Sequence, residues 1–302
     1  MLAFKHQVFL EVAQLRSFTK ASHTLYISQP AISKHIKKLE EEYRTALFER
    51  KGNTITLTSA GEILLEAIRK MKAIQMRAEF EITTHSDPHG AKGELRLGAS
   101  TTVALYIIPR VLSEFHQKYP RMKLSLLNRN SENILLALLA HEVDLGIVEG
   151  KKKAPNVKSQ LFLTDEVVPV CSSQSGMARK TTMKVEDLVR HPVALRERGS
   201  GTLAALKSAL ATCGVKLSDL NVGVRLGGTE ALKNFILADQ CVGFLPMRSV
   251  EKELMSGTLV RLYVEGLTIT RQFYFIERHG VKSDGPGAAF IRLAKAYYNI
   301  KL

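Results

Sequence analysis

The chain has 302 residues, of which 45% are hydrophobic and 24% are charged, and both fractions are ordinary for a globular protein. Its formal net charge of +14 favours an anionic partner, such as nucleic acid or an acidic metabolite. No apolar run approaches the roughly 20 residues of a membrane span, and the N-terminus lacks the apolar block of a signal peptide. We therefore expect a cytoplasmic protein with no membrane partner.

The charge excess is unevenly distributed along the chain. Residues 1–90 contain 13 Lys+Arg and 10 Asp+Glu, a net charge of +3, which leaves +11 for residues 91–302. The net charge of the first ninety residues is too small to attract an anionic partner by itself. Such a partner must therefore be bound by basic side chains placed close together on the surface.

The three cysteines, Cys171, Cys213 and Cys241, are widely separated and show no C-x-x-C pair or Cys/His ligand spacing. We interpret them as reduced core residues; the alternative, a redox-sensing pair, requires a fold that brings two of them together. The sequence also lacks G-x-S-x-G, H-E-x-x-H and P-loop motifs. We therefore expect no catalytic site, no metal and no cofactor.

The first residues predict a helix-turn-helix. Apolar residues recur at helical spacing over residues 4–15, which predicts a first amphipathic helix. Ser17 is suited to cap a short second helix, whose small Ala21 lets a following helix cross closely. A turn at residues 26–27 leads to Ser28, which is a good N-cap for a third helix.

The third helix divides into two faces at 100° per residue. We expect one arc to pack inward, and it carries Ala31, Ile32, His35, Ile36 and Leu39. The opposite arc carries Gln29, Pro30, Ser33, Lys34, Lys37 and Lys38. Glutamine can pair with adenine, serine with bases or phosphate, and lysine with phosphate, so this face suits a DNA major groove. An ordinary amphipathic helix with a solvated face is the alternative, which the preceding helix and turn disfavour.

Residues 47–58 predict a hairpin with its turn at residues 51–53 and alternating apolar residues after it. Arg50, Lys51 and Asn53 would lie at its tip, where a wing can reach the adjacent minor groove or backbone. The prediction is a winged helix-turn-helix. We expect base contacts from Gln29, Pro30 and Ser33 and phosphate contacts from Ser28, Lys34, Lys37 and Arg50.

A long helix is predicted from Ser59 to about residue 84, opened by a capping box at Ser59 and Glu62 and stopped at residues 87–90. Its length would be on the order of 40 Å. Its apolar stripe favours pairing with a second copy of the chain. The alternative is a helix that packs within its own chain.

From residue 93 the pattern alternates between strands and helices, which predicts a mostly parallel sheet. Expected strands are 94–100, 123–129, 143–149, 166–172, 192–197, 222–228 and 242–246, and expected helices are 104–120, 133–140, 201–214, 229–240 and 286–298. Chain crossings near residues 164–166 and 265–268 would produce two lobes around a cleft.

Hydroxyl residues begin helices at matched places in both predicted lobes, where strands end and ligands bind in α/β sheets. They are Ser100, Thr101 and Thr102 in the first lobe and Ser200, Gly201, Thr202 and Thr229 in the second, with Gly201 supplying backbone. Arg196 and Arg198 lie nearby in the sequence. We predict a site for a small anionic effector; plain N-caps are the alternative for each hydroxyl taken singly.

The segments FTKASHTLYISQPAISKHIKKLEEE and LFERKGNTITLTSAGE resemble the signature of the LysR-type transcriptional regulators. The resemblance implies a linker helix that pairs in dimers, frequent tetramers, and an effector domain similar to type-2 periplasmic binding proteins. The segment RERGSGT also resembles members that govern sulfur assimilation and carbon fixation and that sense small anions or phosphorylated metabolites. One departure is Arg44, where the family usually has glycine, because a left-handed helix end costs other residues roughly 1 kcal/mol.

The expected fold is therefore α/β: a winged helix-turn-helix (1–58), a linker helix (59–90) and a two-lobed, periplasmic-binding-protein-like effector domain (91–302). Lobe I would comprise 91–164 and 266–302, and lobe II 165–265. The expected function is effector-modulated binding to promoter DNA by a homodimer or homotetramer, with RNA polymerase as a further candidate partner. Effector binding would favour lobe closure and change the spacing between paired DNA-binding units.

Two other classes of protein remain as alternatives. A solute-binding transport protein would share the two-lobed domain, and failure of the whole chain to bind duplex DNA would favour it. An enzyme built on the same domain would be favoured by turnover of a bound metabolite. The run Lys151-Lys152-Lys153 reads as a solvated loop, with a second contact to DNA or an acidic partner as its alternative.

Overall fold

The computed structural model describes residues 2–52, 54–151, 154–179, 181–279 and 285–299. The predictions for Asn53 and for Lys152 and Lys153 therefore lie outside the described residues. Contacts divide the chain into two compact units, Met1–Ile82 and Thr83–Leu302. Among the described helices, none has the length and apolar character required to span a bilayer.

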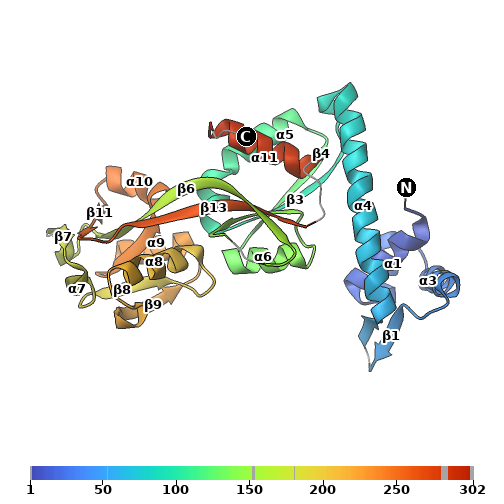
Figure 1. The fold of residues 1–302 in the computed structure, drawn as a ribbon, viewed down its shortest axis with the longest axis horizontal. Coiled ribbons are helices and arrows are strands. Elements are labelled where there is room, and N and C mark those ends of the chain that lie inside the picture. The colour runs from blue at the N-terminus through green and yellow to red at the C-terminus, as the bar shows by residue number, and fades with distance from the viewer. Residues whose placement is uncertain (1, 53, 152–153, 180, 280–284, 300–302) are drawn as a thin grey trace. The chain divides into compact units, whose positions relative to one another are not determined.

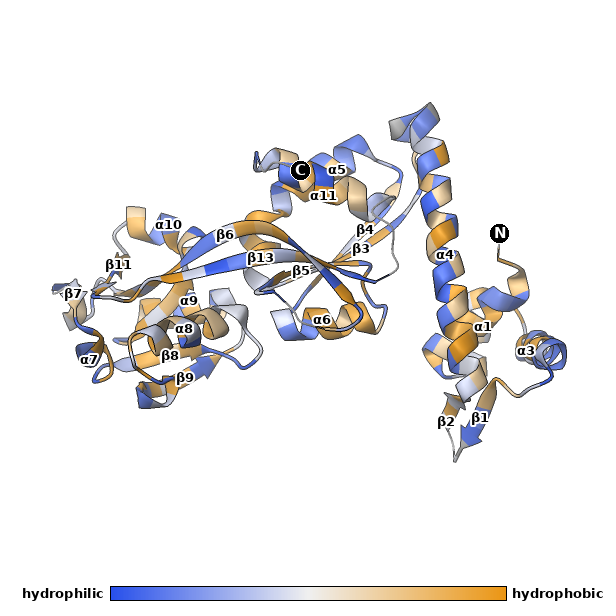
Figure 2. Cartoon of the chain, viewed as in Figure 1, coloured by the Kyte–Doolittle hydropathy of each residue, from blue (hydrophilic) through white to orange (hydrophobic). Residues whose placement is uncertain are grey.

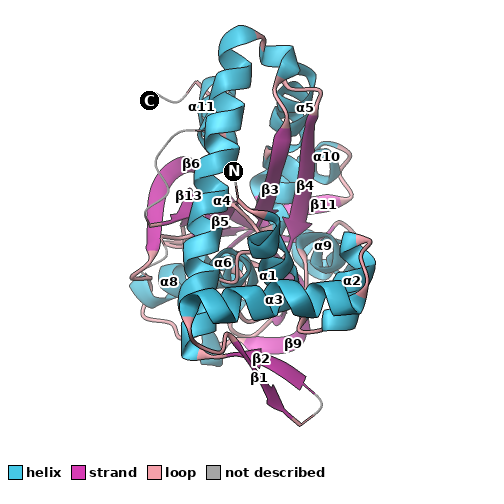
Figure 3. Cartoon of the chain, turned by 90° about the vertical axis from the view of Figure 1, so that its right-hand side faces the viewer, coloured by secondary structure: helices cyan, strands magenta, loops and turns pink. Residues whose placement is uncertain are grey.

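The first unit is a winged helix-turn-helix, as predicted. Its elements are α1 (Phe4–Leu15), α2 (Phe18–Leu25), α3 (Gln29–Tyr43), β1 (Phe48–Lys51), β2 (Thr54–Leu57) and most of α4 (Ser59–Ser86) (Figure 1). Figure 3 shows the β1–β2 hairpin extending from the three-helix group. The inward residues of these helices form one apolar core, whose buried members include Val8, Phe9, Val12, Ala21, Ile32, Ile36, Leu39 and Leu47.

Helices α1, α2 and α3 each end in a left-handed residue that is not glycine. Arg16, Tyr26 and Arg44 have φ values of 50°, 55° and 53°. The left-handed exit at Arg44 is therefore kept without the glycine usual in the family. The Arg44 N–H donates to the last-turn carbonyls of α3, and this bond offsets part of the strain of roughly 1 kcal/mol.

Helix α4 begins at Ser59 as predicted, but the predicted capping box at Ser59 is wrong. The cap is Thr58, whose Oγ1 accepts the Gly61 N–H at 3.1 Å. The same hydroxyl donates to the Ala46 carbonyl at 2.7 Å, so it joins the helix to the segment that enters the wing. That second bond explains why the earlier residue caps the helix.

The apolar residues of α4 form the stripe that the sequence predicted, but this chain covers only part of it (Figure 2). Leu64 and Ile68 pack into the core of the first unit. Four large residues of the same stripe remain exposed, namely Ile63, Met71, Ile74 and Ile82. Part of the stripe is therefore an intrachain contact, and the rest has no cover from the residues that the structure describes.

The second unit contains two lobes, as predicted. The elements of the first lobe are β3 (Gly93–Ala99), η2 (Val103–Ile107), α5 (Pro109–Lys118), β4 (Met122–Asn128), α6 (Ser131–Leu139), β5 (Leu145–Glu149) and α11 (Pro286–Tyr297). Those of the second are β7 (Thr182–Met183), α7 (Val185–Leu188), β8 (Pro192–Arg196), α8 (Gly201–Thr212), β9 (Asn221–Leu226), α9 (Thr229–Ala238), β10 (Val242–Pro246), α10 (Met247–Met255), β11 (Leu259–Arg261) and β12 (Tyr263–Val264). Short 3-10 turns lie at Pro88–Gly90, Gly176–Arg179 and Leu217–Asp219.

Two long antiparallel strands, β6 (Val157–Ser172) and β13 (Ile269–Arg278), run from one lobe to the other (Figure 1). The strand order of the main sheet is β4-β3-β5-β13-β6-β10-β8-β9, with β11 paired to β6. Strands β3, β4 and β5 are mutually parallel in one lobe, as are β8, β9 and β10 in the other. The mostly parallel pattern is thus interrupted at the two crossing strands.

Both faces of the sheet in the second lobe are covered, which explains its nearly continuous apolar strands. On β6, Val167 and Cys171 pack in the cluster that contains α8 residues, whereas Val168 and Val170 pack with α9 and α10. Neighbouring residues of β6 therefore pack into two different apolar cores, one on each face of the sheet.

Two sequence predictions need correction here. The predicted helix 104–120 is broken, because η2 is a π-turn in which the Ile108 N–H donates to Val103 O, and Pro109 has no N–H to continue it. The predicted strand 166–172 is the end of the longer β6. Helix α10 was not predicted.

Candidate nucleic-acid interface and interlobe site

The third helix presents the two faces that the sequence predicts. The Ser28 hydroxyl accepts the Ala31 N–H at 3.4 Å and so caps α3, and Pro30 lies in its first turn. Ile32, Ile36 and Leu39 are buried in the core, and Ala31 and His35 are half-buried. Gln29, Pro30, Lys34, Lys37 and Lys38 are exposed, and Ser33 is half-buried.

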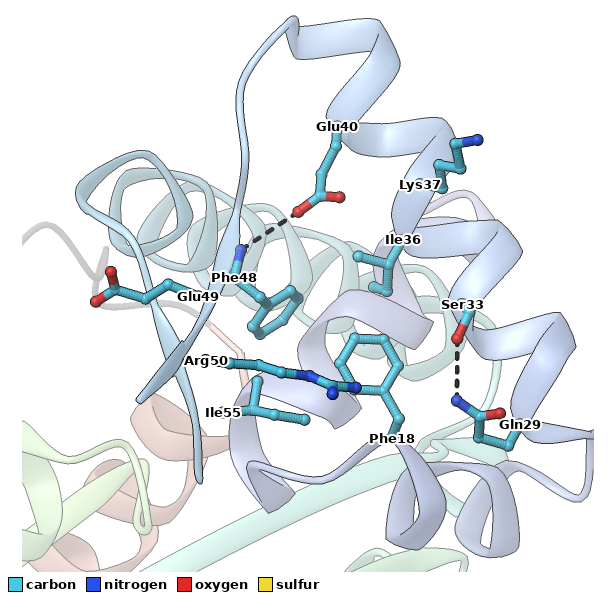
Figure 4. Close-up of a pocket in the computed structure, with 10 residues that line it drawn as sticks. All are labelled: Phe18, Gln29, Ser33, Ile36, Lys37, Glu40, Phe48, Glu49, Arg50 and Ile55. Carbon is cyan, nitrogen blue, oxygen red and sulfur yellow. Dashed lines mark hydrogen bonds between the residues drawn. The ribbon is translucent and has the colours of Figure 1, made fainter. Parts of the chain in front are cut away.

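Two polar side chains of the exposed face are already ordered. The Gln29 Nε2 donates to the Ser33 hydroxyl at 3.1 Å, across one helical turn (Figure 4). Lys37 lies 3.8 Å from Glu41, an exposed pair that contributes little to stability. The Gln29 amide therefore keeps one N–H and its carbonyl oxygen available, with its direction set by Ser33.

A hollow of about 420 Å³ separates α3 from the wing (Figure 4). Its apolar lining comes from Phe18, Ile36, Phe48 and Ile55, and its polar lining from Gln29, Ser33, Lys37, Glu40, Glu49 and Arg50. The Arg50 side chain is exposed on β1, at the wing side of the hollow. The third helix and the wing therefore face one shared recess, to which each contributes one cation and one carboxylate.

One buried cluster in the second unit lies where β5, β13 and α8 meet. Glu149 and Arg271 form an almost fully buried ion pair of 2.9 Å. The Glu149 carboxylate also accepts the hydroxyls of Ser100 at 3.4 Å and Thr202 at 3.3 Å. On its other side, Arg271 donates twice to Asp165, at 3.1 and 2.6 Å. These contacts join a strand end of the first lobe to the first turn of α8 in the second.

A second buried cluster surrounds Arg196, at the end of β8. Its guanidinium donates to Thr229 at 2.9 Å, to Thr101 at 3.2 Å and to Glu197 at 2.8 and 3.0 Å. Burial alone would raise the pKa of Glu197, but the hydrogen bonds and charge of Arg196 more than offset it, so the pKa lies below its ordinary value. The Thr101 and Thr229 hydroxyls are 3.3 Å apart, which makes this cluster a second contact between the lobes.

Two hydroxyls of the predicted site keep bonding capacity. Thr102 is fully buried, and its Oγ1 has no hydrogen-bond partner among the described residues. Ser200 is the N-cap residue of α8, yet its side chain makes no capping bond. A buried hydroxyl without a partner costs about 1–3 kcal/mol. A ligand that offers acceptor oxygens at this place would recover that free energy.

The structure brings five of the seven predicted effector residues, Ser100, Thr101, Gly201, Thr202 and Thr229, into the two clusters between the lobes, with Thr102 and Ser200 next to them in the chain, and it adds three that the sequence reasoning missed. They are Glu149, Asp165 and Arg271. Glu149 ends a predicted strand at the edge where ligands bind, and Arg271 occupies an inward position between the apolar Ile269 and Phe273. The strand-end position of Glu149 and the inward position of Arg271 could both have been recognised in the sequence as signs of a site.

The charge argument for an anion site requires correction. Arg196 is paired with Glu197, and Arg271 is paired with Glu149 and Asp165. Arg198 is exposed. The positive excess of residues 91–302 is therefore not concentrated as unpaired charge at the described junction.

Profiles of two known families match the chain. The profile described as "Bacterial regulatory helix-turn-helix protein, lysR family" matches residues 5–62, and the profile "LysR substrate binding domain" matches residues 88–299. The second match alone covers more than half of the chain.

Similar proteins extend over the whole length. The HTH-type transcriptional regulator CysL of Bacillus subtilis is 27% identical over 98% of this chain and 97% of its own. The CcmR regulatory domain of Synechocystis PCC6803, solved in complex with 2-PG, is 28% identical with a TM-score of 0.61, over 68% of this chain and 97% of that one. Full-length CbnR, solved with its target DNA, has a TM-score of 0.63 at 19% identity, over 98% of this chain and 99% of that one, a likeness of fold alone. The chain belongs to the LysR family of transcriptional regulators, with an N-terminal helix-turn-helix unit and an effector-binding domain.

Proposed function

We propose that this regulator reads duplex DNA with the exposed face of α3 and holds the backbone with the wing. Gln29, Pro30 and Ser33 would contact base edges in the major groove. The observation that carries this proposal is the Gln29–Ser33 hydrogen bond on an exposed, capped helix, because it orients the amide before DNA arrives. The phosphate contacts would come from Ser28, Lys34, Lys37 and Arg50.

The effector of the second unit is proposed to be a small anion bound at the interlobe junction. Support comes from the unpartnered Thr102 hydroxyl, the uncapped first turn of α8 and the two buried arginines. The similar CcmR regulatory domain, solved in complex with 2-PG, supports a small ligand at this domain. Effector binding would shift the lobes between two arrangements and thereby alter DNA binding.

Self-association is proposed to proceed through α4, whose exposed apolar residues recur at spacings of three or eight. A homodimer would present two recognition helices to two half-sites, and a homotetramer would pair two such dimers. The domain limits at 58/59 and 90/91, the division of the lobes at 164/165 and 265/266, the cytoplasmic location and a contact with RNA polymerase also stay proposals.

The DNA-binding proposal is tested with duplexes selected from a random pool by the native full-length chain. Gln29→Ala should reduce the preference for selected over scrambled duplexes by about 10- to 100-fold, since one good base contact is worth about 1–3 kcal/mol. Lys34→Ala should weaken both duplexes equally and reduce the salt slope by about one unit. If both variants lose affinity equally on both duplexes, the assignment of roles is wrong.

The effector proposal is tested by titrating the native chain, Thr102→Val and Ser200→Ala with inorganic sulfate, inorganic phosphate and 2-PG. A probe that binds the native chain should lose at least tenfold affinity in both variants, whereas affinity for selected duplexes in the absence of the probe should stay unchanged. Identical titrations in all three proteins would remove the junction as the effector site.

A further inference from the structure

The side chain of Glu149 covers the start of α8. A Cβ added at Gly201, the first residue of that helix, would overlap the Cβ and carboxylate of Glu149. Glycine at position 201 therefore allows a carboxylate of the same chain to approach the helix N-terminus. Anions are favoured there by the free N–H groups and the helix dipole.

The same carboxylate uses the donors that the sequence assigned to an anionic effector. Ser100 and Thr202 donate to its two oxygens, at 3.4 and 3.3 Å, and Arg271 donates at 2.9 Å. Glu149 is 3% exposed, so little solvent competes for these bonds. The place predicted for the negative group of a ligand is thus occupied by the protein's own negative group.

We propose that Glu149 is a built-in counter-ion of the effector site, and that a small anion binds by displacing its carboxylate from α8 and from Arg271. This inference rests on the proposed function of the same junction and adds the step by which the effector enters. The negative charge is exchanged, so the buried Arg271 keeps two negative partners, the anion and Asp165.

The surrounding contacts allow the side chain alone to move. The Glu149 N–H donates to the Ser131 hydroxyl at 3.1 Å, which holds the backbone at the end of β5. Arg271 keeps its two bonds to Asp165 when Glu149 leaves. Thr102 follows Ser100 by two residues, and its buried hydroxyl, which has no partner among the described residues, is the expected further donor to the incoming anion.

Exchange of charge also determines which ligands can enter. A neutral ligand of similar size would leave Arg271 with Asp165 alone of its two carboxylate partners, whereas an anion would replace the charge of Glu149, so the site should favour the anion. A compact oxyanion with three or more acceptor oxygens could satisfy Ser100, Thr202, Arg271 and Thr102 together. The class of effector is therefore a small oxyanion that competes with an internal carboxylate.

The test compares the affinity of the native full-length chain, Glu149→Gln and Glu142→Gln for inorganic sulfate and inorganic phosphate by isothermal titration calorimetry. Glu149→Gln keeps the shape of the side chain and removes the competing charge, so it should bind at least one of the two anions at least tenfold more tightly than the native chain. Glu142→Gln removes the same charge from an exposed pair with Arg129 in the same lobe and should change affinity less than twofold.

Equal or weaker binding by Glu149→Gln, when the native chain binds, would overturn the counter-ion role and leave the proposed effector site intact. If none of the three proteins binds either anion, this inference is wrong, and a free inorganic oxyanion is not the effector. The DNA-binding function is tested separately, and it would still be supported if the chain binds the selected duplexes. If Glu149→Gln fails to fold, Glu149→Asp provides the test. Its shorter side chain withdraws the carboxylate from α8, so anion affinity should also increase severalfold. Unchanged affinity in Glu149→Asp would contradict displacement.

Discussion

The Glu40 carboxylate on α3 accepts the backbone N–H of Leu47 at 2.9 Å, and this bond joins the recognition helix to the start of the wing. The same oxygen lies 3.4 Å from the Phe48 N. Glu40→Ala should leave both N–H groups without this partner and lower the free energy of unfolding of the first unit by about 1–2 kcal/mol. Chemical denaturation of the full chain, followed by a probe in the first unit, measures this loss.

Glu40→Gln is the matched control, because its amide oxygen can accept the same two N–H groups. Its unfolding should therefore stay close to that of the native chain. The alanine variant should also lose the protection that the wing gives to DNA flanking the major-groove contacts in hydroxyl-radical footprints. Full wing protection in the alanine variant would show that the wing does not depend on this bond.

The recognition helix was predictable because its period of 3.6 residues sorts side chains locally, and Ile32 and Lys34 need no distant information to be assigned to faces. The hydroxyls at Ser100 and Thr202 were predictable because strand ends and helix starts mark ligand-binding edges. The Glu149–Arg271 pair was not, because it depends on β13 returning beside β5 from the far end of the chain. Sequence spacing alone carries no information about that pairing.

Ile74 lies on the exposed apolar face of α4, with 58% of its surface accessible in the chain. Ile74→Asp should weaken self-association by roughly a hundredfold or more, since each copy of the dimer would bury a charge where it now buries an isoleucine worth about 1.5–3 kcal/mol. Sedimentation velocity over a concentration series measures the change. Folding of the chain should be unaffected, because Ile74 is exposed.

Lys72→Asp provides the control for that experiment, because residue 72 is also exposed but lies about 160° around the helix from Ile74. It should leave self-association nearly unchanged. If both aspartate variants weaken it equally, charge rather than the apolar face governs assembly.

Gly201→Ala should destabilise the second unit by about 1–3 kcal/mol, because its Cβ would displace Glu149 from its buried bonds. Helix propensity alone would predict the opposite sign, since alanine favours a helix more than glycine does. Differential scanning calorimetry separates the two effects. Gly223→Ala, where the added Cβ meets nothing within 4 Å, should change the unfolding temperature little. A stabilised Gly201→Ala chain would show that Glu149 moves aside at no cost.

Cys171 and Cys241 should behave as inert core thiols, which decides against a redox pair made from them. Burial raises the pKa of Cys171 to about 11 and that of Cys241 to about 12, from an ordinary value of 9.0, so neither forms the reactive thiolate near neutral pH. An aromatic disulfide reagent at pH 7.5 should therefore label only the half-buried Cys213 rapidly in the native chain and all three cysteines after unfolding. Rapid native labelling of Cys171 or Cys241 would contradict this.

The raised pKa values of Cys171 and Cys241 also determine how the stability of the chain changes with pH in the alkaline range. A folded-state pKa above the unfolded value means that the folded chain binds the proton more tightly, so the stabilisation is complete below about pH 9 and is lost as pH rises towards 11 and 12. Cys171→Ala and Cys241→Ala should each lose stability at pH 8 through the smaller side chain, yet their unfolding free energies should fall less steeply than that of the native chain above pH 9. Urea titrations of the three proteins measure these slopes. Parallel slopes in all three would mean that the two buried thiols do not titrate with unfolding.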